Sequence, residues 1–183
     1  MKPLRILSTA LGLIGMAAPA YAALKAGDSA PLFAAQASLG GKDFTFVLAD
    51  ALAKGPVILY FYPAAFTPGC SIEAHDFAEA MDRFAALGAT VIGVSHDTID
   101  TLNRFSVQDC QGKFPVAADP DLSIAKSYNA VLAPFVPYAN RTSYVIAPDR
   151  RILYSFTDLA PDDHVANTMR AVAEWRAAQK PAN

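Results

Sequence analysis

VILYFY, residues 57–62, is the most informative segment of this chain for its fold. It is a continuous apolar and aromatic run, which is typical of a strand buried on both faces. TVIGVS, residues 90–95, is a second run of the same kind. Between the two runs, four apolar residues recur at helical spacing: Phe77, Met81, Phe84 and Leu87. Strand, helix and strand in this order predict a parallel crossover unit.

Further elements are predicted on both sides of this unit. An N-terminal hairpin is indicated before it by Phe33–Ser38, the Gly40-Gly41 turn and Phe44–Val47. After it, the pattern predicts a helix, a short strand and a short helix: Thr98–Asp109, Val116–Ala118 and Leu122–Tyr128.

The C-terminal part changes to an antiparallel pattern. Tyr144–Ile146 and Ile152–Phe156 flank a turn at residues 148–150, which indicates a hairpin. A last amphipathic helix is indicated by Val165, Met169, Val172 and Trp175. The Pro-rich segment Ala133–Asn140 reads as a surface loop. The whole pattern predicts a three-layer α/β fold, which we interpret as thioredoxin-like: a mixed central sheet flanked by helices, with an added N-terminal hairpin.

The N-terminus has the pattern of a secretory signal peptide. The basic residues Lys2 and Arg5 precede an apolar run from Ile6 to Ala18, and Ala20-Tyr21-Ala22 fits an A-x-A cleavage site. We expect residues 1–22 to be removed and residues 23–183 to form a single thioredoxin-like domain, exported to the periplasm or the extracellular space and not held in a membrane. A retained membrane anchor or a buried helix is the alternative.

Charge and composition exclude several classes of function. The whole chain has a net charge of −2, and loss of Lys2 and Arg5 makes the mature chain more acidic, which disfavours nucleic-acid binding. The three histidines and two cysteines lack the close pairing of zinc sites. We therefore expect no metal and no cofactor.

The candidate site lies where the first buried strand ends and the first long helix begins. Thr67 suits the N-cap position and Pro68 the first helical position, which makes Cys70 the third residue of the helix. There the helix dipole and free backbone amides favour a thiolate, the reactive form of cysteine. A buried, inert cysteine is the alternative from this local chemistry.

The residues around Cys70 carry a family resemblance. Pro63-x-x-x-Thr67-x-x-Cys70 resembles the active-site motif of peroxiredoxins, in particular their bacterioferritin-comigratory or Q-type branch. Further segments similar to that branch follow in the expected order: VIGVS (91–95), Phe114-Pro115, Ala118-Asp119-Pro120, AKSY (125–128) and RTSYVI (141–146).

The resemblance implies a thiol peroxidase that reduces hydrogen peroxide and organic hydroperoxides. In this family pattern Cys70 is the peroxidatic cysteine, Thr67 holds the peroxide, Pro63 shields the thiolate from water, and Arg141 supplies a fixed cation. Glu73, one turn beyond Cys70, either orients Arg141 or is a plain first-turn acid.

The sequence departs from the family pattern at His75, where several relatives carry a second cysteine. The resemblance then leaves Cys110 as the resolving cysteine, because it lies in a region where other members of the branch keep one. A disulfide requires Cα atoms within about 7 Å, so we expect Cys70 and Cys110 to meet only after local unfolding. His75 is interpreted as a solvated helix residue rather than a proton shuttle, and His96 and His164, each near the end of an element, are interpreted in the same way.

Two other functions are compatible with an exported thioredoxin-like fold. A thiol-disulfide oxidoreductase normally needs a C-x-x-C pair, which this chain lacks. A non-enzymic domain stapled by a Cys70–Cys110 disulfide is the other. For the peroxidase we expect a hydroperoxide substrate, a thioredoxin-like or other thiol reductant, and a monomeric or homodimeric state.

Overall fold

The crossover unit lies at the centre of the molecule, as the two apolar runs predict. The computed structural model describes residues 22–179. Strands β3 (Val57–Phe61) and β4 (Thr90–Ser95) pair in parallel, and α2 (Pro68–Ala86) connects them. Every residue of β3 is buried, because the strand has neighbours on both edges and helices over both faces.

A mixed seven-stranded sheet forms around this unit in the order β2-β1-β5-β4-β3-β6-β7. β3, β4 and β5 run parallel to one another, and all other neighbours pair antiparallel. The remaining elements are β1 (Ala34–Leu39), β2 (Lys42–Val47), α1 (Leu48–Leu52), α3 (Ile99–Gln108), β5 (Val116–Ala118), α4 (Ser123–Ser127), β6 (Thr142–Ile146), β7 (Ile152–Thr157) and α5 (His164–Ala178).

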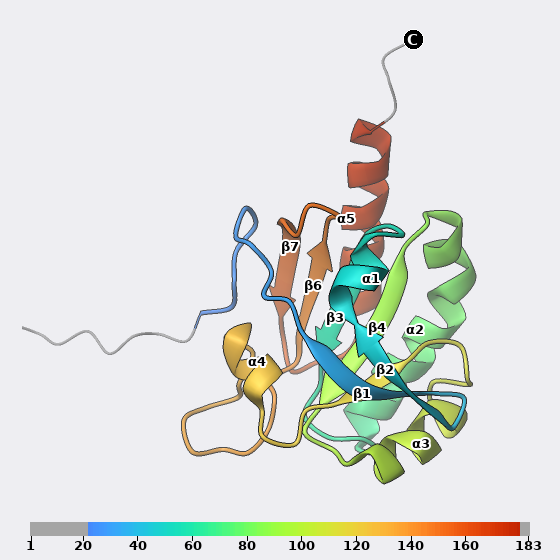
Figure 1. Ribbon diagram of the computed structural model, residues 1–183, viewed down its shortest axis with the longest axis vertical. Helices are drawn as coiled ribbons and strands as arrows, with labels where there is room; N and C mark the ends of the chain where they lie inside the picture. The colour runs from blue at the N-terminus through green and yellow to red at the C-terminus, as the bar shows by residue number, and fades with distance from the viewer. Residues whose placement is uncertain (1–21, 180–183) are drawn as a thin grey trace, which may run out of the picture.

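Alternate residues of β3 build the two halves of the core. Ile58 and Tyr60 pack with α2, α3 and α5 on one face of the sheet, whereas Leu59 and Phe61 pack with α1 and α4 on the other. Figure 1 shows α2 and α5 together on one side of the sheet and α4 on the opposite side. The predicted thioredoxin-like arrangement, with three layers and an added N-terminal hairpin, is confirmed.

Apart from small shifts at the ends of other elements, one helix and one strand boundary differ from the sequence prediction. The short helix α1 was not predicted, because its five residues give too little periodicity for a helical face to be visible. Strand β6 begins at Thr142, earlier than the predicted Tyr144. Thr142 and Ser143 are polar but buried, since both form side-chain hydrogen bonds inside the structure.

The N-terminal prediction falls outside the part of the chain that the structure describes. The signal peptide expected at residues 1–22 overlaps the described residues only at Ala22, and its cleavage stays a prediction. Within residues 22–179 we find no helix with the length and apolar character needed to cross a membrane.

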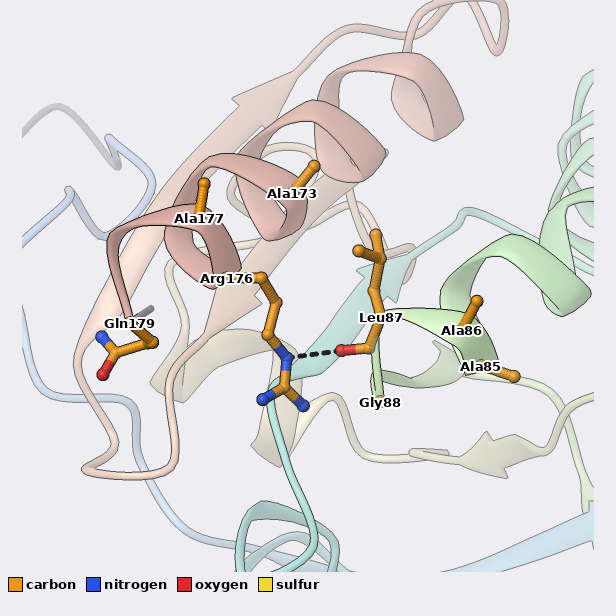
Figure 2. Close-up of a pocket in the computed structure, with 8 residues that line it drawn as sticks. All are labelled: Ala85, Ala86, Leu87, Gly88, Ala173, Arg176, Ala177 and Gln179. Atoms are coloured by element: carbon orange, nitrogen blue, oxygen red, sulfur yellow. Dashed lines mark hydrogen bonds between the residues drawn. The ribbon is translucent and has the colours of Figure 1, made fainter. Parts of the chain in front are cut away.

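A surface hollow lies beyond the C-terminal end of α2, the end opposite to Cys70. Arg176 of α5 reaches across this hollow, and its Nε donates a hydrogen bond of 2.6 Å to the backbone oxygen of Leu87 (Figure 2). A cation at the last carbonyls of a helix is favoured by the helix dipole. We therefore assign Arg176 a structural role, fastening α5 to α2.

Candidate active site

Cys70 occupies the helix position that the sequence predicts. Thr67 is the N-cap of α2 and Pro68 its first residue, so Cys70 is the third, with only 1% of its surface exposed. The Thr67 hydroxyl does not cap the helix but donates to the Ala64 oxygen at 3.0 Å. The first amides of α2 thus have no side-chain cap, and such amides favour an anion beside them.

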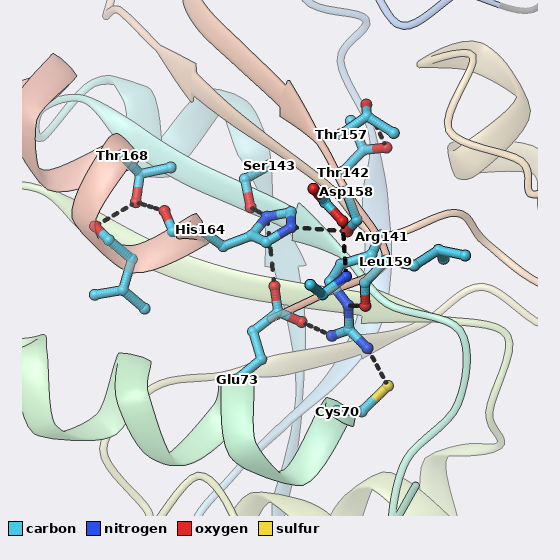
Figure 3. A network of polar contacts seen from close by, with 12 residues as sticks. Cys70, Glu73, Arg141, Thr142, Ser143, Thr157, Asp158, Leu159, His164 and Thr168 are labelled. Atoms are coloured by element: carbon cyan, nitrogen blue, oxygen red, sulfur yellow. Dashed lines mark hydrogen bonds and ion pairs between the residues drawn. The ribbon is translucent and has the colours of Figure 1, made fainter. Parts of the chain in front are cut away.

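Strand pairing brings Arg141 to Cys70. Phe61 at the end of β3 pairs with Thr142 at the start of β6, so Arg141, which precedes Thr142, lies beside the start of α2. Its Nη2 donates to the Cys70 sulfur at 3.5 Å, and its Nε donates to the Leu159 oxygen at 2.9 Å. Figure 3 shows this guanidinium between the sulfur and the other groups that hold it.

Glu73 fixes the third edge of the Arg141 guanidinium. It lies one turn beyond Cys70 on α2, is fully buried, and its Oε2 accepts a hydrogen bond from Arg141 Nη1. The orienting contact with Arg141 is therefore confirmed, and the reading of Glu73 as a plain first-turn acid is wrong. Burial raises the pKa of Glu73 to about 8, although Arg141 acts in the opposite direction.

His164 contradicts the sequence interpretation of a solvated residue. It is fully buried at the start of α5, with Nδ1 at 2.8 Å from Ser143 Oγ and 3.6 Å from Glu73 Oε1. Its Nε2 lies 3.0 Å from the Asp158 oxygen. Sequence reasoning missed both His164 and Ser143, because an isolated histidine or serine carries no signal of which side chain it will meet.

The loop of residues 63–67, which leads into α2, forms hydrogen bonds with the two residues that follow β4. Ala65 N donates to Asp97 Oδ2 at 2.8 Å, and His96 Nδ1 lies 3.0 Å from the Pro63 oxygen. His96 is half-buried, so it is only partly solvated. The carboxyl ends of parallel strands meet at one edge of a sheet, and this rule could have drawn attention to Asp97.

Cys110 forms no disulfide with Cys70 and is not among the hydrogen-bond partners of Arg141 in the described part of the chain. It is fully buried just beyond the end of α3, and both cysteines of the chain are free. Burial, with a smaller effect of Asp109, raises the pKa of the Cys110 thiol well above its ordinary value. His75 is exposed, as predicted, and its ring lies 3.4 Å from the Gln111 amide and 3.9 Å from the Asp109 carboxylate.

Comparison with known proteins identifies the family. The model of the AhpC/TSA family matches residues 26–155 of this chain. The chain belongs to the AhpC/TSA family of peroxiredoxins. It is 30% identical to peroxiredoxin Bcp of Escherichia coli strain K12 over 146 residues, which cover 77% of this chain and 90% of that protein.

Solved peroxiredoxin structures share its fold. The crystal structure of peroxidoxin BcpB from Mycobacterium tuberculosis superposes with a TM-score of 0.75 at 26% identity, over 86% of this chain and 99% of that one. Peroxiredoxin Q of Xanthomonas campestris gives a TM-score of 0.67 at 23% identity, over 77% and 90% of the two chains, which shows the common fold.

Family membership determines the general activity. As a peroxiredoxin the protein is a thiol-dependent peroxidase with a peroxide substrate and a thiol reductant. The non-enzymic stapled domain is not supported, because the family is enzymic and the structure leaves both cysteines free.

Proposed function

We propose that Cys70 is the peroxidatic cysteine and that the Cys70–Arg141 contact is the centre of the reaction. The supporting observation is the Arg141 Nη2 at 3.5 Å from the Cys70 sulfur. Arg141 is itself almost fully buried and held by Glu73 and by the Leu159 oxygen, so its charge has a fixed position. A preorganised cation of this kind stabilises a charge that moves during a reaction.

The reaction follows from the chemistry of a thiolate beside a peroxide. The Cys70 thiolate attacks one peroxide oxygen, so that the S–O bond forms while the O–O bond breaks. The bonding electron pair passes to the other oxygen, which takes the peroxide proton and leaves as water or an alcohol. The sulfur is oxidised to a sulfenate, which becomes a sulfenic acid on protonation.

The residues around Cys70 have different roles in this reaction. Arg141 stabilises the thiolate and the negative charge on the leaving oxygen. Thr67 lies on the same helical turn as Cys70 and offers its hydroxyl oxygen to the peroxide. Pro63 shields the sulfur from water, in a loop that His96 and Asp97 hold in place.

Resolution of the sulfenic acid is assigned to Cys110. Its thiol attacks the Cys70 sulfur, a disulfide forms and water leaves. Cys110 is fully buried and not bonded to Cys70, so we expect the end of α3 to open before the two sulfurs meet. A thioredoxin-like dithiol protein then reduces the disulfide and is oxidised itself. If the N-terminal segment is a cleaved signal peptide, this donor acts in the periplasm or outside the cell.

Substitution of Cys70 tests the assignment directly. Cys70→Ser retains nearly the same side-chain volume but has no accessible anion, so peroxide reduction should be lost while the circular dichroism spectrum stays unchanged. Turnover at the wild-type rate by this variant would contradict the proposal.

Arg141→Ala tests the role of the cation. We expect the oxidation of Cys70 by peroxide, measured by stopped flow, to slow by about 10²–10³-fold, a common value for one preorganised donor. An unchanged rate would make Arg141 a structural residue only.

A further inference from the structure

The side chains behind Arg141 leave one buried acceptor without a partner. Glu73 Oε2 accepts from Arg141, but Glu73 Oε1 has no hydrogen-bond partner among the described residues. The nearest ring atom is His164 Nδ1, at 3.6 Å. A buried oxygen without a hydrogen bond costs free energy, so this arrangement requires an explanation.

The Asp158 oxygen determines which ring nitrogen of His164 carries hydrogen. A backbone carbonyl only accepts, so Nε2, which lies 3.0 Å from it, must donate. In the neutral ring Nδ1 is then an acceptor that faces the carboxylate. Ser143 suits either state of Nδ1, because a hydroxyl can donate or accept at 2.8 Å.

One additional proton, held on Glu73 Oε1 or on His164 Nδ1, makes the pair neutral overall. At 3.6 Å the two atoms face each other just beyond hydrogen-bond distance, and Ser143 Oγ, 2.8 Å from Nδ1, is the hydrogen-bond partner of that nitrogen. Resting on the function proposed above, we propose that His164 is a positioning residue: it shares one proton with Glu73 and thereby controls how much of the Arg141 charge acts on Cys70 (Figure 3).

The effect on Cys70 follows from the charges around the pair. With the proton present, the pair is neutral and the Arg141 charge acts on the sulfur without compensation. When the pair loses this proton to solvent, the Glu73 carboxylate becomes negative and offsets the positive charge of Arg141. Burial raises the pKa of Glu73 to about 8 and lowers that of His164, and both directions leave one proton on the pair near neutral pH. The other ionisable groups coupled to the pair are Tyr60, Asp76, Arg141, Asp158 and Asp163, and Cys70 contacts Arg141.

The first test is the pH dependence of the rate constant for oxidation of Cys70 by hydrogen peroxide. In the wild type this rate constant, expressed per thiolate, should fall as pH rises through about 8. His164→Gln and His164→Asn cannot exchange the proton, so the fall should move to lower pH by about one unit in each. Two variants are used because one substitution of a buried residue can fail to fold.

A matched control separates this effect from damage to the helix. Thr168 is buried one turn further along α5, and its hydroxyl donates to the His164 backbone oxygen at 2.8 Å, not to Glu73. Thr168→Val should leave the midpoint of the fall at its wild-type pH. If the fall keeps its wild-type midpoint in the folded His164 variants, or moves equally in Thr168→Val, the proposal is wrong.

The second test does not depend on peroxide chemistry, so failure of the inference can be told apart from failure of the proposed function. In a ¹⁵N NMR titration of the full chain, His164 Nε2 should stay protonated while the Nδ1 shift changes with a midpoint near pH 8. Glu73→Gln should abolish this midpoint. An Nδ1 shift that is constant from about pH 6 to 10, or an unprotonated Nε2, overturns the shared proton.

Discussion

At the scale of single residues, Gly69 is required by its neighbour Arg141. A Cβ atom at this position would lie 3.0 Å from Arg141 Nη2, which is closer than ordinary van der Waals contact. Glu73 and the Leu159 oxygen restrict how far the guanidinium can retreat. Gly69→Ala should therefore displace Nη2 from the sulfur and slow the oxidation of Cys70 by about 10- to 100-fold, measured by stopped flow.

A double-substitution experiment shows whether the effect passes through Arg141. In an Arg141→Ala background no guanidinium is left to displace, so addition of Gly69→Ala should change the rate little. If Gly69→Ala slows both backgrounds equally, the glycine acts on the helix start itself and the argument from close approach fails.

At the scale of elements, the end of α3 limits access to Cys110. The chain leaves this helix through two left-handed residues, Gln111 at φ 52° and Gly112 at φ 64°. Gly112 N donates to the Ser106 oxygen at 2.8 Å, and Cys110 N donates to the Phe105 oxygen at 3.1 Å. Helix ends of this kind open locally at a small part of the cost of global unfolding.

Cys110→Ser should separate the first oxidation from recycling. Cys70 should still react with peroxide at nearly the wild-type rate, because Cys110 is not one of the groups that hydrogen-bond Arg141 or Cys70. Without the resolving thiol, excess peroxide should add oxygen atoms to Cys70 in succession, whereas the wild type loses two hydrogens, as intact-mass spectra would show.

Val107→Ser serves as the control for this experiment, because Val107 is an exposed residue of α3, three positions before Cys110. Its mass pattern should match the wild type. Identical oxygen additions in the wild type and in Cys110→Ser would assign Cys110 to packing and leave an enzyme with a single reactive cysteine.

At the scale of the whole molecule, the buried Glu73–His164 pair makes stability depend on pH. An unfolded glutamate ionises near pH 4.5, but burial raises the pKa of Glu73 to about 8, so between these values the folded state binds more protons. Burial lowers the pKa of His164 from 6.5, which costs stability only as pH falls below that value. From pH 6.5 to about 8, Glu73 is the only one of the two residues whose proton binding differs between the folded and unfolded states. The unfolding free energy should therefore fall as pH rises through this range.

Urea denaturation at several pH values measures this slope. One group contributes at most about 1.4 kcal/mol per pH unit. Glu73→Gln cannot ionise and should flatten the slope in this window, whereas Glu79→Gln, an exposed residue on the same helix, should keep it. A wild-type slope in Glu73→Gln would show that Glu73 is ionised throughout.

The layers of the fold and the place of Cys70 at the start of α2 could be predicted from sequence patterns alone. Continuous apolar runs at residues 57–62 and 90–95 can only be buried strands or buried helices, and their length with the helical face between them decides for a crossover unit. Thr67 and Pro68 act within one turn of backbone, so the start of α2 could be predicted from local chemistry. Arg141 was found through the family pattern and not through its spacing.

The groups packed behind Arg141 could be identified only in the folded chain. Glu73, Ser143 and His164 come from α2, β6 and α5, and the β3–β6 pairing together with the packing of α5 brings them into contact. Whether a polar side chain is solvated or buried depends on partners that are distant in sequence, and no local pattern reports them. For the same reason, the burial of Cys110 could be seen only in the folded chain. This burial is why the proposed resolution step requires the end of α3 to open.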